Sequence, residues 1–123
     1  MRTSETIDRY CQAWSDPDPT RREECLAGIW AVNATYTDPT VRLEGALELL
    51  SHISKVQASR PGARVLRTTE LDEHHGIARF GFQAIGTDGS VLREGVDVAF
   101  MDADGTSIKR IIGFFGPLVK AAT

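Results

Sequence analysis

The chain has 123 residues, of which 41% are hydrophobic and 25% charged, and its formal net charge at pH 7 is -3. This length can bury one hydrophobic core, so we expect a single domain spanning residues 1–123. The composition is that of an ordinary globular protein and excludes a disordered or fibrous chain. The 14 Lys and Arg residues are scattered along the chain, which excludes the clustered basic face that binds nucleic acid.

No apolar run approaches the roughly 18 residues of a membrane span. The first ten residues, "MRTSETIDRY", lack the apolar segment of a signal peptide. We therefore predict a cytoplasmic protein without a membrane partner. Cys11 and Cys25 have no CxxC spacing and are expected to be reduced, structural thiols. His74 and His75 are adjacent, and on a strand they would point to opposite faces, so no metal site is predicted.

Three helices are predicted in the first half of the chain. The first runs from about Ser4, a plausible N-cap, to Trp14, with apolar residues at helical spacing. The second starts at a capping box formed by Thr20 and Glu23 and continues through Trp30. A short strand at 34–38 and a turn containing Pro39 follow. The third helix begins at Gly45 and ends at 60–62, with an apolar stripe of Leu47, Leu50, Ile53 and Val56.

The second half is predicted to consist of four strands at 63–71, 77–85, 91–101 and 107–115. They are separated by "HHG", "GTDG" and "DADG", which supply the positive-φ residues of hairpin turns. Helices followed by an antiparallel meander indicate an α+β fold with the helices across one face of the sheet. Within 91–101 strict alternation places Asp97 on the same face as Arg93, so a charged residue interrupts a strand that is otherwise fit for burial.

These features together resemble the nuclear transport factor 2-like superfamily, and within it SnoaL-like proteins and ketosteroid isomerase. The resemblance is carried by the strand that ends in Asp-Pro, the helix start "LEGALELLSHI" and the closing "GFFG". It implies a cystatin-like α+β barrel, a cone in which a curved antiparallel or mixed sheet wraps around N-terminal helices and leaves a pocket open at one end. It also implies a homodimer formed through the outer sheet face, and no cofactor.

The resemblance to ketosteroid isomerase implies three catalytic residues. The stretch "ATYTDP" matches the general-base motif and would make Asp38 the base. Tyr10 stands at the position of a tyrosine that donates to the substrate oxygen. Asp97, in an Asp-x-x-Phe setting, stands at the position of a second, protonated aspartate that donates to the same oxygen. Removing a proton next to a ketone requires a carboxylate base and donors aimed at the developing enolate, and an apolar pocket keeps one carboxyl protonated.

We therefore predict a pocket for a small hydrophobic carbonyl compound. Aromatic residues expected to line it are Tyr36, Trp14, Trp30, Phe80 and Phe82. The reaction would be isomerisation or a polyketide cyclase-like step, and the sequence does not separate the two. Simpler roles remain open: Asp38 can cap the turn, Asp97 can pair with Arg79 or Arg93, and the chain can be a noncatalytic ligand-binding protein with the same pocket.

Overall fold

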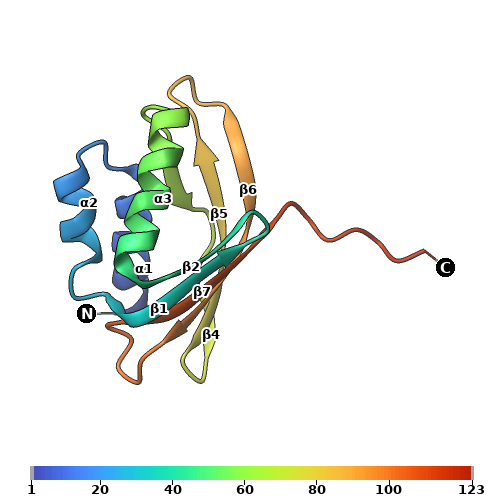
Figure 1. Ribbon diagram of the computed structural model, residues 1–123. Helices are drawn as coiled ribbons and strands as arrows, with labels where there is room; N and C mark the ends of the chain where they lie inside the picture. The colour runs from blue at the N-terminus through green and yellow to red at the C-terminus, as the bar shows by residue number, and fades with distance from the viewer. Residues whose placement is uncertain (1, 123) are drawn as a thin grey trace.

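The computed structural model describes residues 2–122 and shows three helices on one side of a curved sheet (Figure 1). The helices are α1 (Thr3–Ser15), α2 (Pro19–Leu26) and α3 (Gly45–Ser59). The strands are β1 (Trp30–Asp38), β2 (Val41–Glu44), β3 (Arg64–Arg67), β4 (Asp72–His74), β5 (Ile77–Ile85), β6 (Val91–Met101) and β7 (Ile108–Phe115). None of the helices in this described range has the length and apolar character needed to cross a membrane.

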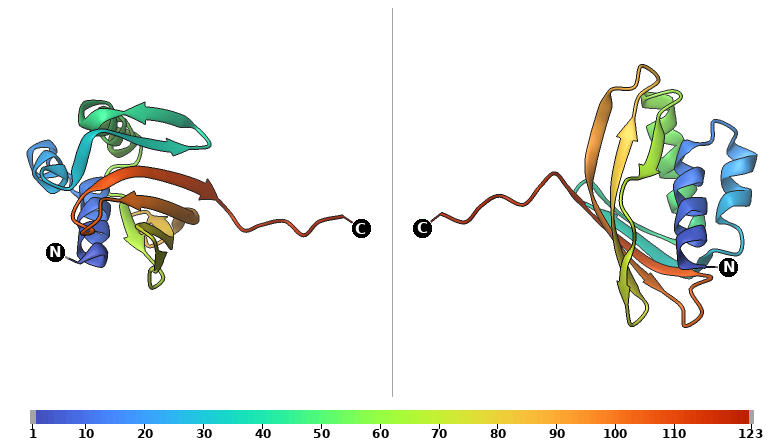
Figure 2. Two further views of the ribbon diagram at one scale, coloured as in Figure 1. Left: turned by 90° about the horizontal axis from the view of Figure 1, so that it is seen from below. Right: turned by 180° about the vertical axis from the view of Figure 1, so that it is seen from behind.

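The strands form one mixed sheet in the order β2-β1-β7-β6-β5-β3, and β4 pairs with β5 beside β3. All neighbouring strands are antiparallel except β1 and β7, which run parallel. Seen from below and from behind, the sheet curves around the helical layer (Figure 2). The predicted α+β class and the curved mixed sheet are confirmed. Residues 117–122 leave the sheet and extend away from the body (Figure 1).

The strand predictions differ in how well they match the structure. Strands β5 and β6 begin and end at the predicted residues. The strand predicted at 34–38 begins earlier, at Trp30, and β2 was expected to be part of a turn. The strand predicted at 63–71 is shorter, because β3 ends at Arg67, and β4 follows at Asp72–His74, where no strand was predicted. The interruption lies where Thr69 places its hydroxyl against β5 and accepts a hydrogen bond from Gly81 N–H at 2.9 Å, in place of a backbone partner.

The helices also depart from the prediction at their ends. The N-cap of α1 is Arg2, without a side-chain hydrogen bond, rather than Ser4. The cap of α2 is Asp18, which accepts a hydrogen bond from the Thr20 N–H, and not the predicted capping box. Helix α2 ends at Leu26 instead of Trp30, because Gly28 adopts a φ of 79° that a helix does not allow.

In α3 the inward residues are Leu49 and Ile53, which are four apart, whereas Leu47 is 84% exposed. The predicted three-residue stripe failed there because a spacing of three drifts around a helix of 3.6 residues per turn. The core lies between the helices and the inner sheet face. Its fully buried side chains include Tyr10, Ile7, Leu49, Ile53, Phe80, Ile108 and Ile111.

Candidate functional site

A cavity of about 210 Å³ lies between α1, α3 and the inner face of the sheet. It opens away from the packed end of the core, beside the last residues of β1, β5 and β7 and the first half of β6. The residues that line it are Tyr10, Trp14, Tyr36, Asp38, Thr40, His52, Val56, Val65, Phe82, Ala84, Arg93, Asp97 and Phe115. Most of its wall is aromatic or aliphatic. The polar groups are two carboxyls and two tyrosine hydroxyls, with Thr40, His52 and Arg93. Such a lining is typical of small-molecule sites.

Asp38 ends β1 and is held by four hydrogen bonds. The Tyr36 hydroxyl donates to Oδ2 at 2.6 Å, and three donors bind Oδ1: the Thr40 N–H and hydroxyl, each at 2.7 Å, and the Val41 N–H at 3.1 Å. Burial acts to raise the pKa of Asp38, but these hydrogen bonds outweigh it and lower the pKa below its ordinary value. Asp38 is therefore an ionised carboxylate at neutral pH, with both oxygens oriented.

Asp97 lies in the middle of β6, and its pKa is shifted in the opposite direction to that of Asp38. Its side chain points to the inner face, only 6% of the residue is exposed, and no residue within the described 2–122 donates a hydrogen bond to it or pairs with it. Burial, and then the negative charge of Asp38, raise the pKa of Asp97 to about 7. Two carboxyls with separated pKa values in one apolar cavity can act as a base and as a proton donor.

Gly113 of β7 explains how the two acids come close. In the sheet register Gly113 lies opposite Asp97, and its chain neighbour Ile112 lies opposite Thr37, next to Asp38. A Cβ atom added to Gly113 would lie 2.8 Å from Asp97 Oδ1 and 3.5 Å from Asp38 Cβ. The missing side chain therefore provides the space that the Asp97 carboxyl occupies beside Asp38.

The two tyrosines come from different elements and both remain protonated. Tyr10 of α1 is 1% exposed and stacks on Trp30 with ring centroids 5.9 Å apart. Burial raises its pKa well above the ordinary value, and Tyr36 and Asp97 raise it further. Burial also raises the pKa of Tyr36, as does its hydrogen bond to Asp38. Both hydroxyls can therefore donate but do not act as bases at neutral pH.

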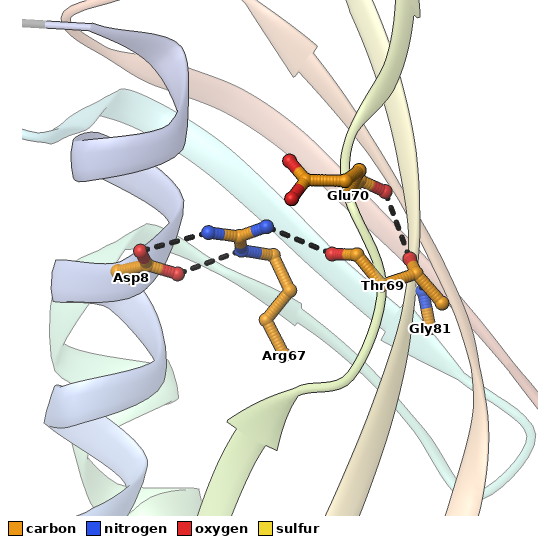
Figure 3. A network of polar contacts seen from close by, with 5 residues as sticks. All are labelled: Asp8, Arg67, Thr69, Glu70 and Gly81. Atoms are coloured by element: carbon orange, nitrogen blue, oxygen red, sulfur yellow. Dashed lines mark hydrogen bonds and ion pairs between the residues drawn. The ribbon is translucent and has the colours of Figure 1, made fainter.

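Helix α1, which carries Tyr10, is fixed to the sheet by a polar network (Figure 3). Arg67 of β3 donates two hydrogen bonds to the Asp8 carboxylate, at 2.8 and 3.0 Å, and a third to the Thr69 carbonyl at 2.8 Å. The pair with Asp8 raises the pKa of Arg67. Because a bidentate pair fixes direction as well as distance, it orients α1 against β3.

Similar proteins of known structure share this architecture. A protein of the SnoaL-like family from Agrobacterium tumefaciens, provisionally named an isomerase, is 28% identical and has a TM-score of 0.84, and the alignment covers 94% of this chain and 97% of that one. The chain has the NTF2-like fold. No protein-family model matches the sequence, and no curated protein matches it either.

Two further structures are similar at lower identity, which shows the fold alone. A protein from Catenulispora acidiphila with a ketosteroid isomerase-like fold, in complex with trimethylamine, has a TM-score of 0.70 at 11% identity, with 91% of this chain and 85% of that one covered. A protein from Sinorhizobium meliloti, provisionally named a polyketide cyclase, has a TM-score of 0.65 at 16% identity, with 92% and 99% covered.

The NTF2-like fold places six of the eight predicted site residues at the cavity. They are Asp38, Asp97, Tyr10, Tyr36, Trp14 and Phe82. The other two, Trp30 and Phe80, do not line it and lie in the core. Trp30 stacks against the side of Tyr10 that faces away from the cavity. Phe80 shares a face of β5 with Phe82 but lies two residues nearer the packed end of the core.

The structure also brings residues to the cavity that the sequence interpretation did not select as site residues. Thr40 completes the cradle of Asp38, and Arg93 and Phe115 lie near the opening. His52 of α3 lies edge-on to Trp14 with centroids 5.7 Å apart, and burial lowers its pKa. Of these four residues, the sequence indicated only Arg93, because the alternation of β6 places it on the same face as Asp97. Arg79, the other candidate partner of Asp97, pairs instead with Asp72 on the outer face.

Proposed function

We propose that the chain is one SnoaL-like domain that binds a small carbonyl compound and moves a proton between two of its carbon atoms without a cofactor. The observation that carries the proposal is the pair of carboxyls in one apolar cavity, one ionised and cradled by four donors, the other buried, unpaired and with a pKa of about 7. An ionised carboxylate is a base, and a protonated carboxyl is a donor to a developing enolate oxygen.

In the proposed reaction Asp38 removes a proton from the carbon next to the carbonyl. The bonding electrons move into the carbonyl, and the enolate oxygen accepts hydrogen bonds from protonated Asp97 and from the Tyr10 hydroxyl. Asp38 then returns the proton to a carbon further along the conjugated system, so no atom is gained or lost. Because Tyr36 and Thr40 hold the carboxylate in place, Asp38 reaches both carbons with little reorientation.

The size of the cavity restricts the substrate. An apolar cavity of about 150 Å³ accommodates benzene. The present cavity, at about 210 Å³, suits a compound of one ring, and its opening allows a substituent to extend outward. The provisional names of similar proteins, an isomerase and a polyketide cyclase, are compatible with proton transfer next to a carbonyl. The polyketide cyclase-like alternative would use the same two carboxyls.

The test uses cyclohex-3-enone, whose conversion to the conjugated cyclohex-2-enone is followed by ultraviolet absorbance. We expect the wild type to accelerate the conversion and Asp38→Asn to lose at least about 100-fold in rate, the contribution of a positioned general base. Asp72→Asn is the matched control, because that aspartate is exposed and pairs with Arg79 outside the cavity. Equal rates for Asp38→Asn and the wild type would remove Asp38 from the mechanism. Enone binding without turnover by the wild type would instead identify a noncatalytic ligand-binding protein.

The proposal includes a homodimer formed through the outer sheet face. On that face β6 and β7 pair Val96 with Phe114 and Val98 with Ile112, and Phe114 is 60% exposed. A continuous apolar strip of this kind is a common feature of protein interfaces. Light scattering coupled to gel filtration should give twice the monomer mass for the wild type and the monomer mass for Phe114→Glu. A monomeric wild type would contradict the dimer and leave the cavity chemistry unaffected.

A further inference from the structure

Arg93 is the one cationic side chain among those that line the cavity in the described range, and it has no charged partner. Its guanidinium forms no ion pair and no hydrogen bond with any residue of 2–122. Its contact is with Phe115, whose ring lies under the guanidinium with 4.0 Å between Cζ and the centroid. The stack holds the guanidinium over the ring and leaves its N–H donors free.

The position of Arg93 along β6 sets it apart from the two acids. Arg93 and Asp97 lie on the same face of the strand, four residues apart, which is roughly 13 Å between their Cα atoms. Between them is Gly95, and its partners across the sheet are Phe82 on one side and Phe115 on the other. These two rings meet edge to face with centroids 6.4 Å apart. The cavity therefore has the two acids on one side of an aromatic floor formed by Phe82 and Phe115, and a free cation on the other side.

The other charged and titratable groups at the cavity do not neutralise Arg93. Asp38 is occupied by its four donors, and Asp97 lies desolvated beside it, beyond Gly95 from Arg93. His52 has its pKa lowered by burial, so it adds no positive charge at neutral pH. An anionic ligand group beside Arg93 would thus meet one cation directly, and the two acids lie beyond Gly95 along the sheet.

We propose that the ligand is a one-ring carbonyl acid, whose carboxylate is bound by Arg93 while its carbonyl reaches Asp97 and Tyr10. The inference deepens the proposed function and rests on it. A planar guanidinium matches a carboxylate with two parallel hydrogen bonds, and Phe115 already fixes the plane of the fork. The ring of the ligand lies over Phe82 and Phe115. Arg93 is thus a specificity-determining residue that selects anionic over neutral carbonyl compounds.

The experiment compares two phenols as enol analogues by isothermal titration calorimetry at pH 7. They are 4-hydroxyphenylacetate, which carries a carboxylate opposite the hydroxyl, and neutral 4-ethylphenol. We expect the wild type to bind the acid at least about tenfold more tightly, the effect of one hydrogen bond to a charged group. Arg93→Gln should abolish this preference and leave the affinity for 4-ethylphenol unchanged, whereas Arg93→Lys should retain part of it. Arg79→Gln, an arginine on the outer face of the same sheet, is the matched control and should keep the full preference.

The outcomes separate this inference from the proposed function. Equal affinities for the two phenols in the wild type, or the same ratio in Arg93→Gln as in the wild type, would overturn the role of Arg93 and leave the proton-transfer chemistry intact. Failure of the wild type to bind either phenol would overturn both. A preference that weakens as salt rises from low to physiological concentration supports the ion pair, because exposed charges are screened.

Discussion

Replacing Asp97 by Asn should stabilise the protein relative to the wild type by an amount that increases with pH. The pKa of Asp97 in the folded protein is about 7, because the carboxyl is buried and lies beside the charge of Asp38. In the unfolded chain an aspartate titrates near pH 4, at about 3.9. Between these two values the unfolded chain has released a proton that the folded protein still holds. Wild-type stability through this group is therefore intact below about pH 4 and falls until about pH 7.

The magnitude follows from the same two pKa values. At about 1.4 kcal/mol for each pH unit, the wild type loses about 4 kcal/mol of unfolding free energy through Asp97 by pH 8. That loss is a large part of the roughly 5–15 kcal/mol that stabilises an ordinary domain. Asn has nearly the same shape and does not titrate, so the Asp97→Asn difference removes the contributions of the other groups. Any cost of burying the amide is independent of pH and shifts the whole curve without changing its slope.

The assay is urea unfolding at pH 5, 6, 7 and 8, followed by the fluorescence of the two buried tryptophans, Trp14 and Trp30. The stability difference between Asp97→Asn and the wild type should rise by about 1.4 kcal/mol per pH unit from pH 5 to 7 and then level off. Glu94→Gln, an exposed change on the opposite face of the same strand, should give a flat difference. A difference for Asp97→Asn that stays constant from pH 5 to 8 would refute the raised pKa.

Three further changes test the surroundings of the acids. Tyr36→Phe removes the 2.6 Å hydrogen bond to Asp38, so the pKa of that carboxyl should rise in a carbon-13 titration; an unchanged pKa would show that the bond does not matter. Gly113→Ala places a methyl group 2.8 Å from Asp97 Oδ1 and should reduce turnover and cost about 1–3 kcal/mol in urea unfolding; wild-type turnover would show that the carboxyl position is not critical. Arg67→Gln breaks the pair with α1 and, because its partner is half exposed, should cost about 1 kcal/mol or less. A larger loss of stability for Arg67→Gln would mean that the network does more than orient the helix.

The parts of the fold that could be predicted are those with a strong local pattern. Strands β5 and β6 alternate strictly and are bounded by turn sequences, so their ends were predicted correctly. Strand β2 has only four residues, and its pairing with β1 depends on a turn whose geometry the local sequence does not reveal. The end of α2 was missed because the helical spacing continues through Trp30 while the backbone reverses at Gly28.

The candidate site was predictable to the extent that a motif or strand parity carried it. The "ATYTDP" stretch and the alternation of β6 indicated Asp38 and Asp97, and the structure places both at one cavity. Strand alternation could not distinguish Phe82 from Phe80, because both side chains point to the inner face of β5. They differ only in their position along the strand, which puts Phe82 at the cavity and Phe80 in the core. That difference is set by sheet curvature and by the helices, which are long-range properties.

By itself, the sequence determined the order of the elements, the inward face of the central strands and the types of acid available for proton transfer, because each of these depends on neighbours along the chain. Only the tertiary structure decided that β1 pairs in parallel with β7 and that Gly113 leaves room for the carboxyl of Asp97. It also decided that one aspartate has four donors while the other has none within the described residues. The physical reason is that a pKa and a cavity depend on desolvation and on contacts between residues distant in sequence, and these exist only once the sheet has curved around the helices.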